Sequence, residues 1–261
     1  MTLRATQLAG FAARRLLLTT ITLDQDRDSV DLFTEFNEPA DLATYTVIIV
    51  SGVTIGSASA ATPALTTSAL FIPGSDFVIV FQGSAQVIGK GGPGGDGGKG
   101  VSDPEPIIRG QGGGGGGGQG SGISLGGAAG GPQAFAGQNG SVSNFGSGGL
   151  GSTTGLGPET NGQVGANGGV AIETFYDMII DGQTEPGDGR IYGGGAGGSG
   201  STPTVLPFGG GFRDGADGAP FGEDSTGFQP AFGGAAILVQ AGTVIYLPNK
   251  AALDIRGAAP A

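Results

Sequence analysis

The chain has 261 residues, of which 59 are glycine, and a net charge of −11 with no His, Cys or Trp. The missing side chains exclude disulfides, thiolate and imidazole metal sites, and catalytic arrangements built on Cys/His or Ser/His pairs. The charge argues against nucleic acid as a partner, because phosphate neutralisation needs clustered Lys and Arg. No apolar run approaches the roughly 18 residues of a membrane-spanning helix, so we expect no membrane insertion.

The placement of the glycines predicts the domain organisation. All but seven of the 59 glycines lie between residues 89 and 240. We therefore expect an N-terminal attachment segment (1–42), a β region (43–88), a glycine-rich domain (89–240) and a C-terminal strand and tail (241–261). A β-hairpin is expected inside the glycine-rich domain at about residues 170–192.

The N-terminal segment begins with a rough helical period of apolar residues over 1–18, which is compatible with a short amphipathic helix. Residues 24–41 are acidic, and we interpret them as a solvated loop. Their spacing also suggests a weak calcium candidate, because four carboxylates occupy positions 1, 3, 5 and 12 of an EF-hand-like loop: Asp24, Asp26, Asp28 and Glu35. Ser29 replaces the usual glycine of such a loop, so a solvated loop is the preferred interpretation.

Short strands are predicted where Val, Ile and Phe gather between Gly, Pro and Ser, at 45–50, 69–72 and 77–81. Residues 56–68 suit either a loop or a closely packed strand. A strand, a turn and a second short strand precede a glycine block at 77–95 and again at 177–198, and the two strands recur without the block at 236–247. Internal repeats of this kind indicate a stacked architecture.

The glycine blocks contain a period of three, at Gly91, Gly94, Gly97 and Gly100 and at Gly162, Gly165 and Gly168. Three residues per turn is the repeat of the polyproline II helix. With glycine on the other edges, neighbouring helices approach closely enough to exchange backbone hydrogen bonds. We therefore expect a polyglycine II helix bundle beside short β-strand pairs, in a mainly β protein with little α-helix. The alternatives are a flexible linker, which the interspersed phenylalanines disfavour, and collagen, which requires an unbroken glycine period.

The motifs FVIVFQGSAQVIGKGGPGGDGGKG (77–100) and GRIYGGGAGG (189–198) resemble glycine-rich phage tail proteins. Similar motifs occur in the distal part of lambda-like siphophage host-specificity tip proteins and in polyglycine II tail-fibre adhesins of T-even-type phages. The resemblance covers about residues 77–247. It implies a virion tail location, contact with other tail proteins through the N-terminal region, and a bacterial surface protein or glycan as receptor. Siphophage tips imply a homotrimer, whereas T-even-type adhesins imply a single chain that caps a fibre.

The resemblance further implies that the segments between glycine motifs contact the receptor. Exposed aromatic rings are good anchors in such segments because they are large and lose little entropy when ordered. The receptor-binding candidates are Phe135, Phe145, Phe208, Phe212, Phe221, Phe228 and Phe232. For each of them, a place in a thin core at the end of the bundle is the competing interpretation.

Two other motifs suggest chemistry. The GKGGPG run at 89–94 fits G-x-G-x-x-G, but the glycine and proline that follow cannot form the helix that a nucleotide site requires. The adjacent carboxylates Glu223 and Asp224 lack an apolar pocket that would separate their roles in glycoside hydrolysis. We expect no enzymatic activity and no cofactor. A secreted or cell-surface glycine-rich protein, structural or ice-binding, is the alternative to a phage adhesin.

Overall fold

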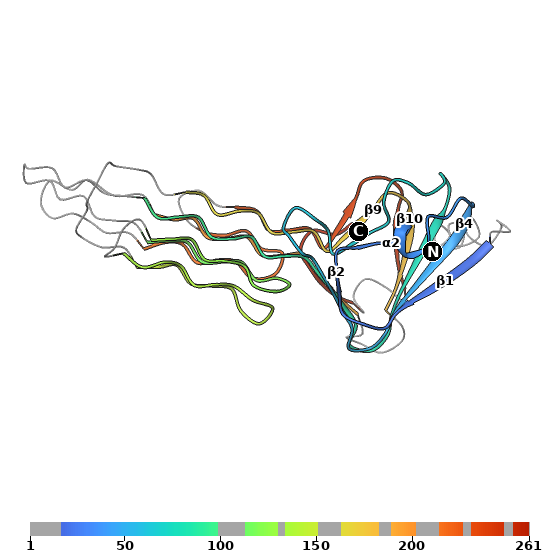
Figure 1. Cartoon of the computed structure of the whole chain (residues 1–261), viewed down its shortest axis with the longest axis horizontal. Coiled ribbons are helices and arrows are strands. Elements are labelled where there is room, and N and C mark those ends of the chain that lie inside the picture. The colour runs from blue at the N-terminus through green and yellow to red at the C-terminus, as the bar shows by residue number, and fades with distance from the viewer. Residues whose placement is uncertain are drawn as a thin grey trace, which may run out of the picture.

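The computed structural model describes residues 17–98, 113–129, 134–150, 163–182, 189–201, 214–226, 231–247 and 253–260. Figure 1 shows two parts, a β-stranded part that contains the labelled strands and a long bundle of extended segments that leaves one side of it. The described residues contain many strands and one short α-helix, α2 (Leu32–Glu35). This confirms the expectation of a mainly β protein with little α-helix. No helix of this described part is long and apolar enough to span a membrane.

The strands form three sheets in which every pairing is parallel. The first sheet has the order β1-β4-β7-β10-β13: β1 (Leu17–Leu23), β4 (Ala43–Ile49), β7 (Asp76–Phe81), β10 (Asp177–Asp181) and β13 (Val244–Leu247). The second has the order β14-β11-β8-β5-β2: β14 (Asp254–Arg256), β11 (Arg190–Tyr192), β8 (Gln86–Ile88), β5 (Thr54–Gly56) and β2 (Arg27–Asp28). The third has the order β12-β9-β6-β3: β12 (Ile237–Val239), β9 (Ile172–Thr174), β6 (Leu65–Thr66) and β3 (Val30–Asp31).

These orders describe a three-sided parallel β-helix. The chain visits the first, second and third sheets in turn and then returns to the first, so β1, β2 and β3 form one coil and β4, β5 and β6 form the next. The predicted hairpin at 170–192 is therefore wrong: β10 pairs with β7 and β13, and β11 pairs with β8 and β14. The repeated strand-turn-strand unit is one corner of a coil, and its two strands lie in different sheets.

Alternating side chains fill the interior of the β-helix. In β4 every second residue is buried, which is the period of a strand with one face inside. The parallel register stacks like positions of successive coils, so Tyr45 lies beside Phe77 and Phe77 beside Met178. All three side chains are almost fully buried. Aromatic rings dominate one corner, where Tyr45 and Phe77 stack with ring centroids 5.5 Å apart.

The β-helix also corrects other expectations from the sequence. The predicted boundary at residue 42 separates β1 and β4, which pair along seven residues. Residues 24–41 are no simple loop, because they contain β2, β3 and α2. Residues 69–72 are not a strand, because they turn between β6 and β7 while the Phe71 ring packs into the core. The amphipathic helix expected at 1–18 lies almost entirely outside the described residues.

Both glycine-rich inserts leave the β-helix at the same corner. The first lies between β8 and β9 and the second between β11 and β12, which are the second and third sides of two successive coils. Because β8 and β11 are hydrogen-bonded neighbours, the inserts start side by side. They therefore merge into the single bundle seen in Figure 1.

The bundle is held by backbone hydrogen bonds with a repeat of three residues. The amides of Gly89, Gly92, Gly95 and Gly98 donate to Tyr192, Gly195, Gly198 and Ser201 at 2.8 to 2.9 Å. The same segment accepts bonds at Gly89, Gly92 and Gly95 from an antiparallel neighbour, through the amides of Ser121, Gly118 and Gly115. Each extended segment thus bonds to different neighbours around its circumference. These bonds repeat every three residues, the period on which the polyglycine II prediction rests.

Two segments, 113–121 and 193–201, form the inside of the bundle. Segment 113–121 exchanges hydrogen bonds with six others: 89–98, 124–129, 134–141, 144–150, 193–201 and 214–220. Segment 193–201 is bonded to 89–98, 113–121, 163–169, 214–220, 223–226 and 231–235. We call these two the inner segments and the remaining eight the outer segments. Every residue of 113–118 and of 193–201 is buried, which explains why 113–118 is an unbroken run of glycine.

Candidate functional site

The outward ends of the longest bundle segments converge at the end of the bundle that is remote from the β-helix (Figure 1). There the amide of Gly98 donates to Ser201 at 2.9 Å, and the amide of Ser201 donates to Gly113 at 3.1 Å. The amide of Gln163 donates to Asp96 at 2.8 Å on the same level. Three stretches of the sequence connect these ends in pairs: 99–112, 151–162 and 202–213. The described residues on either side of each stretch therefore lie at this end of the bundle.

Three candidate phenylalanines are exposed on outer segments. Phe135 and Phe232 keep 63% of their surface accessible, and Phe145 keeps 41%. They do not form one cluster, because Phe135 and Phe145 belong to neighbouring segments and Phe232 lies on 231–235. Phe208, Phe212 and Phe228 lie outside the described residues.

Phe221 does not fit the prediction of a surface anchor, because only 5% of it is exposed. It lies at a turn of the bundle next to the β-helix and forms a small apolar cluster with Ile88 and Tyr192. Its ring centroid is 4.7 Å from that of Tyr192. Ile88 and Tyr192 are the last residues of β8 and β11, immediately before the two glycine inserts begin. Phe221 therefore closes the junction between the β-helix and the bundle.

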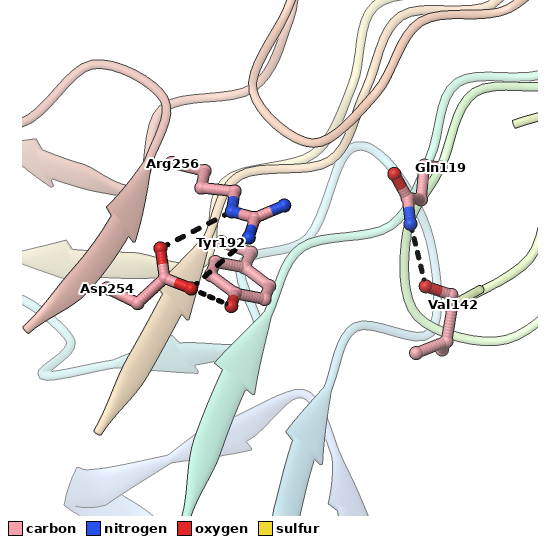
Figure 2. A network of polar contacts seen from close by, with 5 residues as sticks. All are labelled: Gln119, Val142, Tyr192, Asp254 and Arg256. Atoms are coloured by element: carbon pink, nitrogen blue, oxygen red, sulfur yellow. Dashed lines mark hydrogen bonds and ion pairs between the residues drawn. The ribbon is translucent and has the colours of Figure 1, made fainter. Parts of the chain in front are cut away.

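A polar network surrounds the same junction (Figure 2). The Tyr192 hydroxyl donates to Asp254, and Arg256 donates to both Asp254 oxygens at 3.3 Å. The Arg256 guanidinium lies 4.8 Å from the centroid of the Tyr192 ring, within cation–π range. The last coil of the β-helix is thus bonded to the residue from which the second insert starts.

The pKa values of Tyr192 and Asp254 keep this network hydrogen-bonded at neutral pH. Burial raises the pKa of Tyr192 to about 12, and the hydrogen bond to Asp254 adds to this shift. Burial alone would raise the pKa of Asp254, but hydrogen bonds from Tyr192 and Arg256 hold that pKa below its ordinary value. At neutral pH Tyr192 is therefore a proton donor and Asp254 a charged acceptor, so the junction stays bonded.

The structural glycines named from the period of three lie in close backbone contacts. A methyl group at Gly91, Gly94, Gly165 or Gly168 would overlap the carbonyl oxygen of Gly118, Gly115, Gly197 or Gly194, respectively. The amide of Gly97 donates to Ala128 at 2.9 Å. Gly100 and Gly162 lie outside the described residues. The glycine period thus marks the edges on which segments of the bundle touch.

The calcium candidate is not supported by the positions of its carboxylates. Asp26 accepts the amide of Thr54 at 2.7 Å, and Glu35 pairs with Arg27 at 2.6 Å. Asp28 lies in β2, because the acidic stretch is wound into the first coil of the β-helix. Among the residues that the structure describes, no three carboxylates gather in a way that could hold a metal ion.

Sequence reasoning missed the Asp and Asn side chains that complete the backbone bonding of the bundle. Asp96, Asp217 and Asn167 accept the amides of Ala128, Gly148 and Phe232 at 2.7 to 2.9 Å. Each stands on an outer segment and replaces a carbonyl acceptor that a further helix would supply. The available signal was an Asp or Asn within or beside a glycine triplet, as in GGDGG at 94–98.

No protein-family model matches the chain, and no curated protein matches its sequence. Among solved structures it is similar to the crystal structure of the gp37-gp38 adhesin tip complex of the bacteriophage S16 long tail fiber. The identity is 12%, the match covers 97% of this chain and 92% of that chain, and the TM-score is 0.41. A likeness of this degree identifies no function.

Proposed function

We propose that this chain is a tail-fibre or tail-tip protein of a bacteriophage, and that it binds a host-surface receptor with the end of the bundle remote from the β-helix. The observation that carries the proposal is the convergence of the ends at Gly98, Gly113, Gln163 and Ser201. Hydrogen bonds between the described segments fix these ends close together, as a packed core fixes the attachment points of binding loops in other proteins. The sequence resemblance to phage adhesins agrees with this arrangement.

The β-helix is the part that we assign to the tail. Among the strands that the structure describes, β1 is an edge of its sheet, and its seven residues contain no charge. The first strands of the other two sheets, β2 and β3, are two residues long and contain Arg27, Asp28 and Asp31. Charged, short edge strands resist pairing with another chain, whereas a long uncharged edge invites it. We therefore propose that another tail protein contacts the chain at β1.

The proposed role is structural and adhesive, without catalysis. We also propose separately that the protein is a homotrimer, as the siphophage resemblance implies. The mass of the purified protein in solution distinguishes a trimer from a single-chain cap.

The ice-binding alternative requires regular rows of small or Thr side chains. The exposed side chains of segment 134–141 are instead Phe135, Ala136, Gln138 and Asn139.

Purified protein is expected to block infection of host cells by the phage that encodes it. A variant in which 202–213 is replaced by a Gly/Ser stretch of equal length should keep its thermal stability and lose the block. A control variant in the β-helix, Leu70→Ala at a side chain that is 65% exposed, should block infection as the parent does. Failure of the parent to bind host cells, together with its absence from purified virions by mass spectrometry, would contradict the proposal.

A further inference from the structure

One side of the bundle is built from segments without a charged residue, and only its two borders meet carboxylates, those of Asp96 and Asp217. The outer segments 124–129, 134–141 and 144–150 are hydrogen-bonded side by side, and they appear in green and yellow-green in Figure 1. No charged residue occurs in the sequence between Arg109 and Glu159. The outer segments 214–220 and 223–226 instead carry Asp214, Asp217, Glu223 and Asp224. In a chain with a net charge of −11, the uncharged side is a distinct surface.

Large apolar side chains stand on this uncharged side in a fixed register. The amide of Phe135 donates to Leu150 at 2.8 Å, and the two side chains are 63% and 56% exposed. Three residues nearer the β-helix, the amide of Gln138 donates to Ser147 at 2.8 Å. Another three residues in the same direction, the amide of Ser141 donates to Asn144 at 2.7 Å. Each step is three residues, or about 9 Å at the polyproline II rise. Phe145 stands on another edge of segment 144–150, because Gly148, one turn of three residues further along, faces the carbonyl oxygen of Gly215 on segment 214–220.

Free amide groups lie on the same edges as Phe135 and Leu150, because Gln138 is three residues from Phe135 and Asn144 six from Leu150. The exposed side chains of Gln138 and Asn144 form no hydrogen bond with any described residue. The neighbouring Asn139 differs, because its oxygen accepts the amide of Gly126 at 2.9 Å. Gln138 and Asn144 are therefore available to a ligand, and each offers two donors and one acceptor oxygen.

The surface is already ordered before any ligand arrives. Gln119 of the inner segment donates to the carbonyl oxygen of Val142 at 2.8 Å and holds the turn next to Phe145 (Figure 2). The glycines of these segments cannot move apart without breaking their backbone bonds. A ligand therefore loses little affinity to ordering of the protein.

We propose that this surface, defined by Phe135, Gln138, Asn144 and Leu150, binds a neutral oligosaccharide of the bacterial surface along the bundle. Aromatic faces attract the polarised C–H groups of a sugar ring, and the amides bond to its hydroxyls. A purely apolar partner would leave the amides unpaired, and an anionic partner would meet no positive charge on these segments. The inference deepens the proposed function and rests on it, because it adds a second class of contact to the same receptor-binding part.

The test uses the full chain on an array of neutral and acidic bacterial polysaccharides, followed by calorimetric titration of the strongest binder. A neutral glycan should bind, and Phe135→Ala should weaken it about tenfold or more, as for an aromatic anchor at a binding site. Gln138→Leu should weaken it several-fold. Leu70→Ala is the control, because Leu70 is 65% exposed, about as much as Phe135, but lies in the turn between β6 and β7, so the affinity of this variant should match that of the parent.

Three outcomes would overturn the inference: no neutral glycan binds, Phe135→Ala binds as tightly as the parent, or the surface pairs two copies. In the last case sedimentation would show a dimer that Phe135→Ala dissociates. The proposed function fails separately. Glycan binding without attachment to host cells would contradict the adhesin, whereas attachment without glycan binding would contradict only this inference.

Discussion

Replacing Gly115 with alanine is expected to lower the free energy of unfolding of the bundle by about 1–3 kcal/mol, the usual cost of overpacking a core. Gly115 lies on the inner segment 113–121, where an added methyl group would overlap the carbonyl oxygen of Gly198. The obstacle is backbone, so no side chain can rotate away. Segment 193–201 would have to shift, and its own bonds to the outer segments would be lost with it. Thermal unfolding and limited proteolysis both measure this effect.

The control for this substitution is Ala136→Val. It adds more atoms than Gly115→Ala, yet residue 136 is exposed on an outer segment, so its unfolding temperature should match the parent. Equal stability of Gly115→Ala and the parent would show that the inner segment is not packed as described. A flexible glycine linker would give that result.

Replacing Phe221 with alanine is expected to destabilise the protein by about 3–5 kcal/mol, as for other buried phenylalanines. The change removes the ring that packs on Tyr192 and leaves a cavity beside Ile88. Because these residues stand where both inserts leave the β-helix, the bundle should become sensitive to protease before the β-helix unfolds. Chemical denaturation followed by proteolytic mapping measures both effects.

Phe135→Ala separates this structural role from a binding role. Its ring is exposed, so its removal should leave the unfolding midpoint unchanged. If Phe221→Ala kept full stability and instead lost attachment to cells, the sequence-based prediction of a receptor anchor would be right and the junction role wrong.

The sequence predicted the chemistry of the bundle better than its geometry. The period of three at Gly91, Gly94 and Gly97 indicated helices that touch on glycine edges, and the backbone bonds of these residues repeat at the same spacing. The meaning of the run at 113–118 was missed. A segment with neighbours on all sides has no edge left for a side chain, and that requirement is visible only once the number of neighbours is known.

The β-helix was hidden by its inserts. Strands β7, β10 and β13 are neighbours in space, but 95 residues separate the end of β7 from the start of β10. Strand propensity located β4 and β7, whereas the parallel pairing of distant strands is a tertiary property that local patterns do not encode. Phe221 and Phe135 illustrate the same limit. Both stand among glycines, and only the fold decides that one closes a junction while the other faces solvent.

Amide hydrogen exchange of the intact protein tests the packed bundle most directly. The consecutive amides of residues 114–118 donate to Phe135, Gly95, Ala216, Gln138 and Gly92, respectively, at 2.8 to 3.1 Å. In an unstructured run of glycines these amides would exchange at the rate of an unfolded peptide. We predict slow exchange in 113–118 and in 193–201, comparable with β4 and β7. Exchange of the two inner segments at unfolded rates, while the β-helix remains protected, would contradict a rigid bundle that presents its far end to a receptor.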